Sequence, residues 1–332
     1  MSYDLVVNLL LIVIGIFVLI RSGIYIVKSL VAIAHFLNVS EFTLSFILMA
    51  FATTLPEFAI GVNAAVNNQP LISLGNILGA NILNLSLTLG LITLIAGKLT
   101  IKSYSLAHRS WFNFALGISP ILFAIDGEIS KIDGLALIIL FFLHISRLFH
   151  LREIFHHKKN FWLSLVNNFG HRPDGLGIKY FFKNLFIFIA GAGLLLLSAN
   201  LAVKGAKAIS LDLGVSEIII GIFIVALGTT LPEIVFGIRA AISKNKELSL
   251  GNLFGATVFN STWILGVVSL ISPIKIQMSL SFWISAATMI LVLFLANLFL
   301  STRGEITKRE GIGLILIYIL FVAFQIFTIN RF

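Results

Sequence analysis

The sequence contains no cysteine, and charged residues are scarce in it. The lack of cysteine among its 332 residues excludes disulfides and thiolate metal sites. Aspartate, glutamate, lysine and arginine together supply 11% of the chain, whereas soluble domains carry about 25% charged residues. Hydrophobic residues supply 58%. This composition excludes an ordinary soluble domain and predicts an all-α integral membrane protein.

The net charge of +9 comes from 23 basic and 14 acidic residues. These charges stand in short loops between apolar runs, which is how membrane topology is encoded, so nucleic acid is not an expected partner. The longest polar stretch, residues 151–179, is basic and predicts a cytoplasmic connector. Counting spans outward from it places the other basic loops on the same side. We therefore expect a multi-pass protein of the cell membrane with both termini outside.

Apolar runs long enough to cross a bilayer recur along the chain. A transmembrane helix needs about 20 apolar residues, and a window of that length predicts ten spans. The N-terminal run lacks a basic segment and a cleavage site, so we interpret it as the first span rather than a signal peptide. The predicted spans lie near 5–32, 41–66, 71–96, 109–125, 131–149, 180–209, 217–242, 248–271, 280–300 and 310–329.

An internal repeat relates the first five spans to the last five. A shift of 176 residues aligns 45–90 with 221–266 without a gap, with 18 identities in 46 positions. Because each half has an odd number of spans, the halves cross the membrane in opposite directions. Ion sites of inverted-repeat transporters lie near the midplane where the repeats meet. The predicted organisation is one five-helix repeat in 1–150, the connector in 151–179 and a second five-helix repeat in 180–332.

One five-residue motif occurs in the second span of each half. Residues 53–57 read Thr-Thr-Leu-Pro-Glu, and the same five residues return at 229–233. An ionisable group at mid-membrane costs about 2.5–3.5 kcal/mol on insertion scales and commonly faces an ion pathway or a partner. No lysine or arginine in the neighbouring apolar cores is placed to neutralise both Glu57 and Glu233. We therefore expect a bound cation or a proton to balance them.

Oxygen atoms near these glutamates are the candidate cation ligands. The prolines disturb the preceding turn, which predicts released carbonyls, and asparagines of the next span complete the ring of oxygens or hydrogen-bond the glutamates. Hard cations such as Ca²⁺ take roughly 6–8 oxygen ligands. The predicted set comprises the carboxylates of Glu57 and Glu233, the hydroxyls of Thr54 and Thr230, the carbonyls of Ala50, Thr53, Ala226 and Thr229, and the amides of Asn84 and Asn260.

Two motifs together resemble the two alpha repeats of the sodium/calcium exchanger family, within the cation/calcium antiporter superfamily. They are Thr-Thr-Leu-Pro-Glu and, in the next span, Gly-Asn-x-x-Gly-Ala at 75–80 and 251–256. The resemblance covers nearly the whole membrane part, and the short connector is similar to that of prokaryotic members. It implies that Glu57 and Glu233 coordinate calcium and take part in sodium binding. The carbonyls of Thr53 and Thr229 and the hydroxyls of Thr54 and Thr230 would join them.

The chain departs from the family pattern at four positions. Members often carry serines at the positions of Ala80 and Ala256, and an aspartate in one repeat where Asn84 or Asn260 stands here. Two hydroxyl ligands for sodium are therefore absent, and the site carries two formal negative charges rather than three. Two carboxylates still balance Ca²⁺, so a central divalent site is expected, while the sodium sites and the coupling ion are left open.

The sequence therefore predicts a secondary active cation antiporter, with sodium/calcium exchange by alternating access as the favoured activity. The expected partners are inorganic cations and the lipid bilayer, with no cofactor and no obligatory protein partner. A proton-coupled calcium exchanger, or one for magnesium or monovalent cations, is the alternative within this fold, and a channel is the alternative outside it. An enzyme is not expected, because no span carries a nucleophile with a base or a His-Glu-x-x-His motif.

Overall fold

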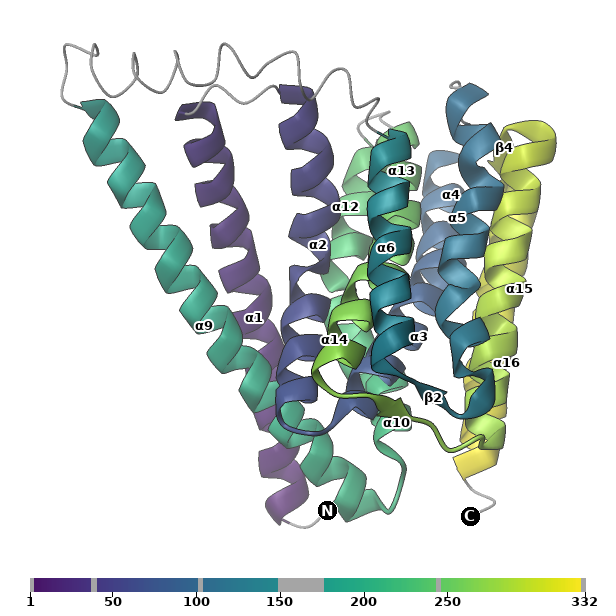
Figure 1. Cartoon of the computed structure of the whole chain (residues 1–332). Helices are drawn as coiled ribbons and strands as arrows, with labels where there is room; N and C mark the ends of the chain where they lie inside the picture. The colour runs from purple at the N-terminus through teal and green to yellow at the C-terminus, as the bar shows by residue number, and fades with distance from the viewer. Residues whose placement is uncertain (1–2, 37–40, 101–103, 149–175, 243–245, 330–332) are drawn as a thin grey trace.

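A helical run lies at each of the ten predicted spans (Figure 1). The computed structural model describes residues 3–36, 41–100, 104–148, 176–242 and 246–329. The first repeat contains α1 (Tyr3–Phe36), α2 (Glu41–Val66), α3 (Pro70–Leu83), η1 (Asn84–Thr88), α4 (Leu89–Ala96), α5 (Tyr104–Phe123), η2 (Ala124–Asp126) and α6 (Lys131–Leu148). The second contains α9 (Leu176–Leu213), α10 (Glu217–Ile220), η3 (Gly221–Val225), α11 (Ala226–Thr229), α12 (Leu231–Ile242), α13 (Lys246–Val258), η4 (Phe259–Ile264), α14 (Leu265–Ile271), α15 (Leu280–Arg303) and α16 (Lys308–Ile329).

Helix ends differ from the predicted spans by a few residues. Helix α9 begins at Leu176, so residues 176–179 belong to a helix and not to the connector. The rest of the connector falls in 149–175, outside the described residues. Among the described residues, six helices are long and apolar enough to cross a membrane on their own, or seven with the bent pair Glu217–Thr229 and Leu231–Ile242. The chain is therefore a multi-pass membrane protein.

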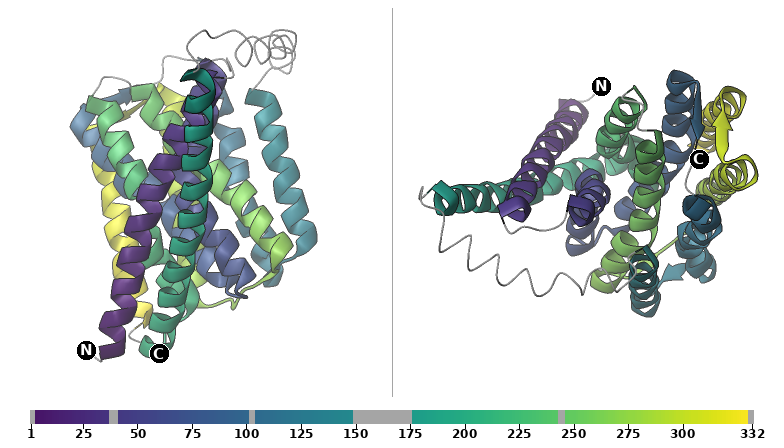
Figure 2. Two further views of the ribbon diagram at one scale, coloured as in Figure 1. Left: turned by 90° about the vertical axis from the view of Figure 1, so that its left-hand side faces the viewer. Right: turned by 90° about the horizontal axis from the view of Figure 1, so that it is seen from above.

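Helices α1 and α9 form a slanted pair on one side of the molecule (Figures 1 and 2). Glycines let their backbones approach closely, because a Cβ at Gly15 would lie 3.0 Å from the carbonyl oxygen of Ser198, and one at Gly205 2.9 Å from that of Asn8. Their buried apolar side chains form one core cluster with α2, α3 and the η3 region. A second cluster joins α3, α4 and α13–α16. The candidate site residues are carried by the helices between these two clusters.

Two short antiparallel sheets join the halves at opposite ends of the bundle (Figure 1). Strand β1 (Lys98–Thr100) pairs with β4 (Glu305–Thr307), and β2 (Glu128–Ile129) pairs with β3 (Ile274–Lys275). Lys98 Nζ also forms an ion pair with Glu305 Oε2 at 2.9 Å. Segments of two or three residues are too short for a periodic pattern, so the sequence did not predict these strands. They tie the loops of one repeat to those of the other.

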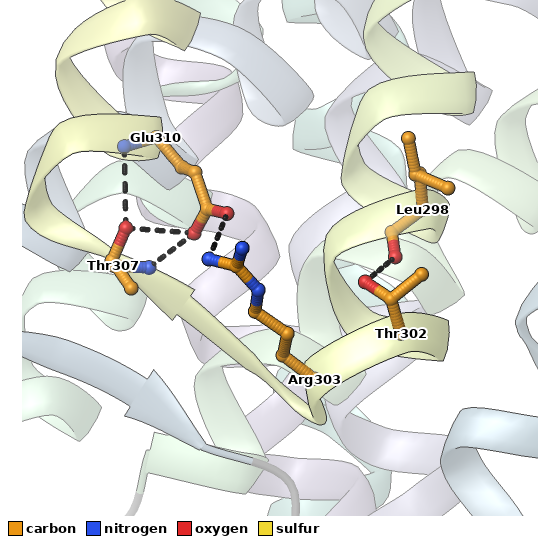
Figure 3. Close-up of polar contacts among 5 residues, drawn as sticks. All are labelled: Leu298, Thr302, Arg303, Thr307 and Glu310. Carbon is orange, nitrogen blue, oxygen red and sulfur yellow. Dashed lines mark hydrogen bonds and ion pairs between the residues drawn. The ribbon is translucent and has the colours of Figure 1, made fainter.

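A capping box orders the turn between α15 and α16 (Figure 3). The hydroxyl and the N–H of Thr307 donate to Glu310 Oε2 at 2.8 and 2.7 Å, and the N–H of Glu310 donates to Thr307 Oγ1 at 3.4 Å. Arg303 lies 3.8 Å from the other Glu310 oxygen. Gly304 supplies the left-handed backbone, at φ 63°, that ends α15. Ser130 and Asp133 form the same box at the start of α6.

Thr307→Val should destabilise this turn more than Thr302→Val. The Thr302 hydroxyl bonds only the carbonyl of Leu298 in its own helix, at 2.7 Å (Figure 3), whereas Thr307 caps α16. Loss of an N-cap side chain costs about 0.5–2 kcal/mol. The unfolding midpoint of purified protein in detergent should therefore fall for Thr307→Val and stay close to that of the parent for Thr302→Val. Equal shifts in the two variants would contradict a capping role.

Candidate cation site between the two repeats

The glutamates of the repeated motif lie buried in the helices that correspond in the two halves. Glu57 stands in α2 and Glu233 in α12, and each side chain is 1% exposed. They lie close enough for the carboxylate of Glu57 to act electrostatically on that of Glu233. The structure therefore brings together the two residues that the sequence placed 176 positions apart.

Neither carboxylate has an ion pair or a hydrogen bond of ordinary geometry among the described residues. All four carboxylate oxygens of Glu57 and Glu233 are buried without a donor. The ion pairs of the described side chains are Lys98–Glu305 and Arg303–Glu310, both at the end of the bundle. Burying an ionised carboxylate without compensation costs several kcal/mol per ion. Two such groups side by side thus create a strong preference for a positive charge between them.

The same motif has two backbone conformations. In the second repeat the helical run breaks at Thr230, between α11 and α12, and bends by 41°. In the first repeat α2 continues through Pro56 without interruption. The expectation that each proline disturbs the preceding turn is therefore correct for the second repeat and wrong for the first. Proline removes one backbone donor, but neighbouring helices can support a continuous helix around it within a membrane.

The carbonyl of Ala226, predicted to be released, is occupied in the structure. It accepts the N–H of Thr230 at 3.0 Å, the Thr230 hydroxyl at 2.7 Å and the Thr229 hydroxyl at 3.3 Å. The reason is geometric, since a proline withholds its N–H from the carbonyl four residues earlier, which is Gly228 for Pro232. The side chain of Ala50 lies outside those that the structure describes.

The four threonines of the motif are buried or partly buried, and Thr229 and Thr53 lie beside Glu57 and Glu233. Thr54, Thr229 and Thr230 are fully buried, and Thr53 is partly buried. The hydroxyls of Thr53 and Thr229 each cross to the other repeat. Thr53 donates to Asn252 Oδ1 at 3.3 Å, and Thr229 donates to Asn76 Oδ1 at 3.1 Å. The two repeats therefore interlock beside the carboxylates through matching pairs.

The asparagines predicted as ligands begin or lie within π-helical segments. Asn84 opens η1, and Asn260 is the second residue of η4; π-bulges frequently mark functional sites. Both side chains are buried, and Asn84 Oδ1 and Asn260 Oδ1 have no donor among the described residues. Two further neutral oxygens therefore lack a partner in the core of the bundle.

Two polar residues that the sequence did not single out, Asn81 and Ser261, form a hydrogen-bonded chain with Asn260. Asn260 Nδ2 donates to Asn81 Oδ1 at 3.1 Å, and Asn81 Nδ2 donates to Ser261 Oγ at 3.0 Å. Thr257, which matches Asn81 in the second repeat, bonds its own helix at Leu253 O instead. The repeat carried no signal for this network, because Asn81 and Ser261 have no identical counterparts. For Asn76 and Asn252 a signal existed, since both stand in the repeated Gly-Asn motif.

Each repeat has a helix contact beside the site, here called a seam, at the first glycine of its Gly-Asn motif. The two seams, at Gly75 and at Gly251, differ in packing. A Cβ at Gly75 would clash with the carbonyl oxygen of Ile218, and one at Gly221 would lie 2.6 Å from that of Ile72, so α3 packs directly on α10 and η3. This seam lies at the lower end of Figure 1. Gly251, which matches Gly75, is exposed, and no described atom lies within 4 Å of its Cβ position. One seam is therefore closed, and the other is not packed at the matching glycine.

Comparisons with known proteins agree with this arrangement. The family model described as "Sodium/calcium exchanger protein" matches residues 7–149 and 183–327. The sodium/calcium exchanger MaX1 of Methanosarcina acetivorans is 28% identical, over 95% of this chain and 97% of its own. An uncharacterized membrane protein of Methanocaldococcus jannaschii is 30% identical, over 88% of this chain and 89% of its own.

A solved structure has the same fold along nearly the whole chain. The sodium-calcium exchanger NCX_Mj, from a crystal soaked with Na⁺ and Ca²⁺, superposes with a TM-score of 0.60 at 28% identity. The match covers 97% of this chain and 99% of that one. The all-α membrane fold is thereby confirmed, with six or seven helices among the described residues long and apolar enough to cross a membrane. With the family model covering both repeats, the chain belongs to the sodium/calcium exchanger family.

Proposed function

We propose that the protein exchanges Ca²⁺ for Na⁺ across the cell membrane, with the transported cation held between Glu57 and Glu233. The observation that carries this proposal is the set of four buried carboxylate oxygens, two from each repeat, that have no partner among the described residues. A transported cation would supply the missing positive charge. Because each repeat contributes one glutamate, the site lies where motion of one repeat against the other opens and closes it.

The ligand chemistry favours a hard divalent cation. Ca²⁺ prefers oxygen ligands. The glutamates, asparagines and threonines of the proposed site supply carboxylate, amide and hydroxyl oxygens. Among the described residues no group of three or more acidic, histidine or cysteine side chains could hold a metal ion. The proposed site is thus limited to two carboxylates with neutral oxygens, and its formal charge of −2 equals the charge that one Ca²⁺ neutralises.

Competition for the same carboxylates would couple the two fluxes. Bound Ca²⁺ or Na⁺ neutralises the site. An empty site keeps two uncompensated carboxylate charges, and these make reorientation of the site within the apolar core unfavourable. Exchange follows because only loaded states reorient. No cofactor or catalytic chemistry enters this cycle, and the cations are its substrates.

One observation favours proton coupling as the second candidate. Ala80 and Ala256 are fully buried beside the asparagine-bearing segments and provide no side-chain oxygen. A site with fewer oxygens has fewer ligands for several Na⁺ ions, while a proton needs only a carboxylate. Under this alternative, H⁺ would replace Na⁺ as the ion that competes with Ca²⁺ at Glu57 and Glu233.

The two seams support alternating access. With the basic connector assigned to the cytoplasm and both termini outside, the closed seam at Gly75 faces outside and the seam at Gly251 faces the cytoplasm. On this assignment we infer that access to the site from the cytoplasm passes along the Gly251 seam. In the other state the Gly251 seam would close and the Gly75 seam would open, while the α1–α9 pair shifts across the core.

Radioactive calcium uptake into proteoliposomes tests the function. Vesicles preloaded with Na⁺ and diluted into Na⁺-free buffer with ⁴⁵Ca²⁺ should accumulate calcium, and vesicles without a Na⁺ gradient should not. A parallel experiment with a pH gradient alone reports proton coupling, and protein-free vesicles measure leakage. Uptake that follows only the pH gradient would replace Na⁺ by H⁺ in the proposal. No gradient-driven calcium flux from protein that elutes as a monodisperse species would overturn both candidates.

A further inference from the structure

Two buried asparagines link the candidate site across the repeats. Asn76 of α3 is 0% exposed, and Asn252 of α13 is 4% exposed. Each accepts a hydrogen bond through Oδ1 from a threonine of the other repeat, Asn76 from Thr229 at 3.1 Å and Asn252 from Thr53 at 3.3 Å. The two bonds are related by the same 176-residue offset as the repeats themselves.

The threonines of these pairs stand directly beside the glutamates. Thr53 and Thr229 each precede a glutamate of their own repeat by four residues, about one helical turn. In space, Thr229 lies next to Glu57, and Thr53 lies next to Glu233. Each threonine is therefore placed between a glutamate and an asparagine that both belong to the opposite repeat.

The cross-repeat hydrogen bonds fix where each threonine hydroxyl lies. Each hydroxyl is within hydrogen-bonding distance of an asparagine oxygen of the other repeat. The Thr229 hydroxyl also lies 3.3 Å from the carbonyl oxygen of Ala226 in its own repeat. Without Asn76 that carbonyl would still hold the hydroxyl, but the link between the two repeats would be lost.

We propose that Asn76 and Asn252 are positioning residues of the cation site. Each binds the hydroxyl of a threonine from the opposite repeat and so fixes that hydroxyl beside a glutamate. Each also holds the turn that carries one glutamate against the other repeat, so the two carboxylates keep their separation. This inference rests on the proposed cation site and assigns a role to the asparagine of the Gly-Asn motif.

Double-mutant cycles test the pairing, because residues that act through one another have non-additive effects. The variants are Asn76→Ala, Thr229→Val, Asn252→Ala and Thr53→Val, together with the double variants. Each single variant should raise the apparent KM for calcium about 3- to 10-fold, the effect of losing one hydrogen bond, with little change in the maximal rate. The cross-repeat doubles Asn76→Ala/Thr229→Val and Asn252→Ala/Thr53→Val should be no worse than the worse single variant.

Pairs within one repeat are the matched controls. Asn76→Ala/Thr53→Val and Asn252→Ala/Thr229→Val combine the same substitutions between residues that share no hydrogen bond, so their KM effects should multiply. Effects that multiply in the cross-repeat pairs, or coupling only within a repeat, would overturn the proposal. Single variants with an unchanged KM would do the same. Thr229→Ser and Thr53→Ser keep the hydroxyl, and each should lower the KM relative to the valine variant.

A binding measurement separates this proposal from the transport function. The same cycles can be read from the rise in unfolding temperature that Ca²⁺ produces in detergent-purified protein, which needs no flux. If the cross-repeat variants are non-additive in Ca²⁺ binding but the protein transports no calcium, the proposed exchange is wrong and the positioning role is supported. If the protein transports calcium but the variants are additive in both measurements, the positioning role is wrong and the exchange is supported. Variants that do not elute as monodisperse protein are replaced by the serine forms at the threonine positions.

Discussion

Glu57→Gln and Glu233→Gln should each reduce calcium affinity about 100-fold or more, because the number of charged ligands tunes calcium affinity over several orders of magnitude. Glutamine keeps the size of the side chain and one oxygen but removes the charge. Each variant leaves one carboxylate at the site, which no longer balances a divalent cation. We therefore expect calcium exchange in proteoliposomes to be abolished by either change. Transport that survives either substitution would show that the cation does not bind between these residues.

Glu217→Gln is the matched control for these variants. Glu217 lies in the same helical run as Glu233 but at its beginning, where its side chain is only partly buried. Its loss should leave calcium uptake unchanged. The two site variants should also be at least as stable as the parent in the absence of cations, because each removes a buried charge that has no partner among the described residues. A thermal unfolding series with and without Ca²⁺ checks both effects, and a large destabilisation without cation would indicate a structural role.

The sequence predicted what is encoded in composition and in the repeat. Hydropathy located the helical runs because a bilayer imposes one length on every span, and the end residues of α2 matched the prediction. The repeated motif located Glu57 and Glu233 because a charge in an apolar run needs a partner. Both features depend on a short stretch of chain, so they can be read without knowing what packs against it.

The remaining features depend on contacts between the halves. The pairing of β1 with β4 joins residues 98–100 to 305–307, and no local pattern shows that these loops meet. The break at Thr230 and the continuous helix at Pro56 come from identical motifs, so the packing around each copy decides its backbone. The repeat also gave no signal for the hydrogen bond from Asn260 to Asn81, because Thr257 stands at the position that matches Asn81 in the second repeat. The crossed pairs Asn76–Thr229 and Asn252–Thr53 required the relative placement of both repeats.

Gly75→Ala and Gly251→Ala should have different effects in spite of their matching positions. An added Cβ at Gly75 would clash with the carbonyl of Ile218, so α3 and α10 would have to separate. Overpacking of this kind costs about 1–3 kcal/mol, which is roughly a ten- to hundredfold change in a conformational equilibrium. At Gly251 no described atom lies within 4 Å of the added Cβ in the observed state. Gly75→Ala should therefore destabilise the observed state, and Gly251→Ala should leave it intact.

Cysteine labelling distinguishes these states because the chain has no cysteine of its own. Ile218 is 5% exposed in the closed seam, so Ile218→Cys should react slowly with a membrane-impermeant maleimide. Adding Gly75→Ala should accelerate the reaction about tenfold or more, in line with the cost of overpacking, whereas adding Gly251→Ala should not. Equal rates in the two double variants would show that the seam at Gly75 does not gate access. If the seams do alternate, Gly251→Ala blocks the closure of its own seam, so it should slow calcium exchange while leaving this labelling rate low.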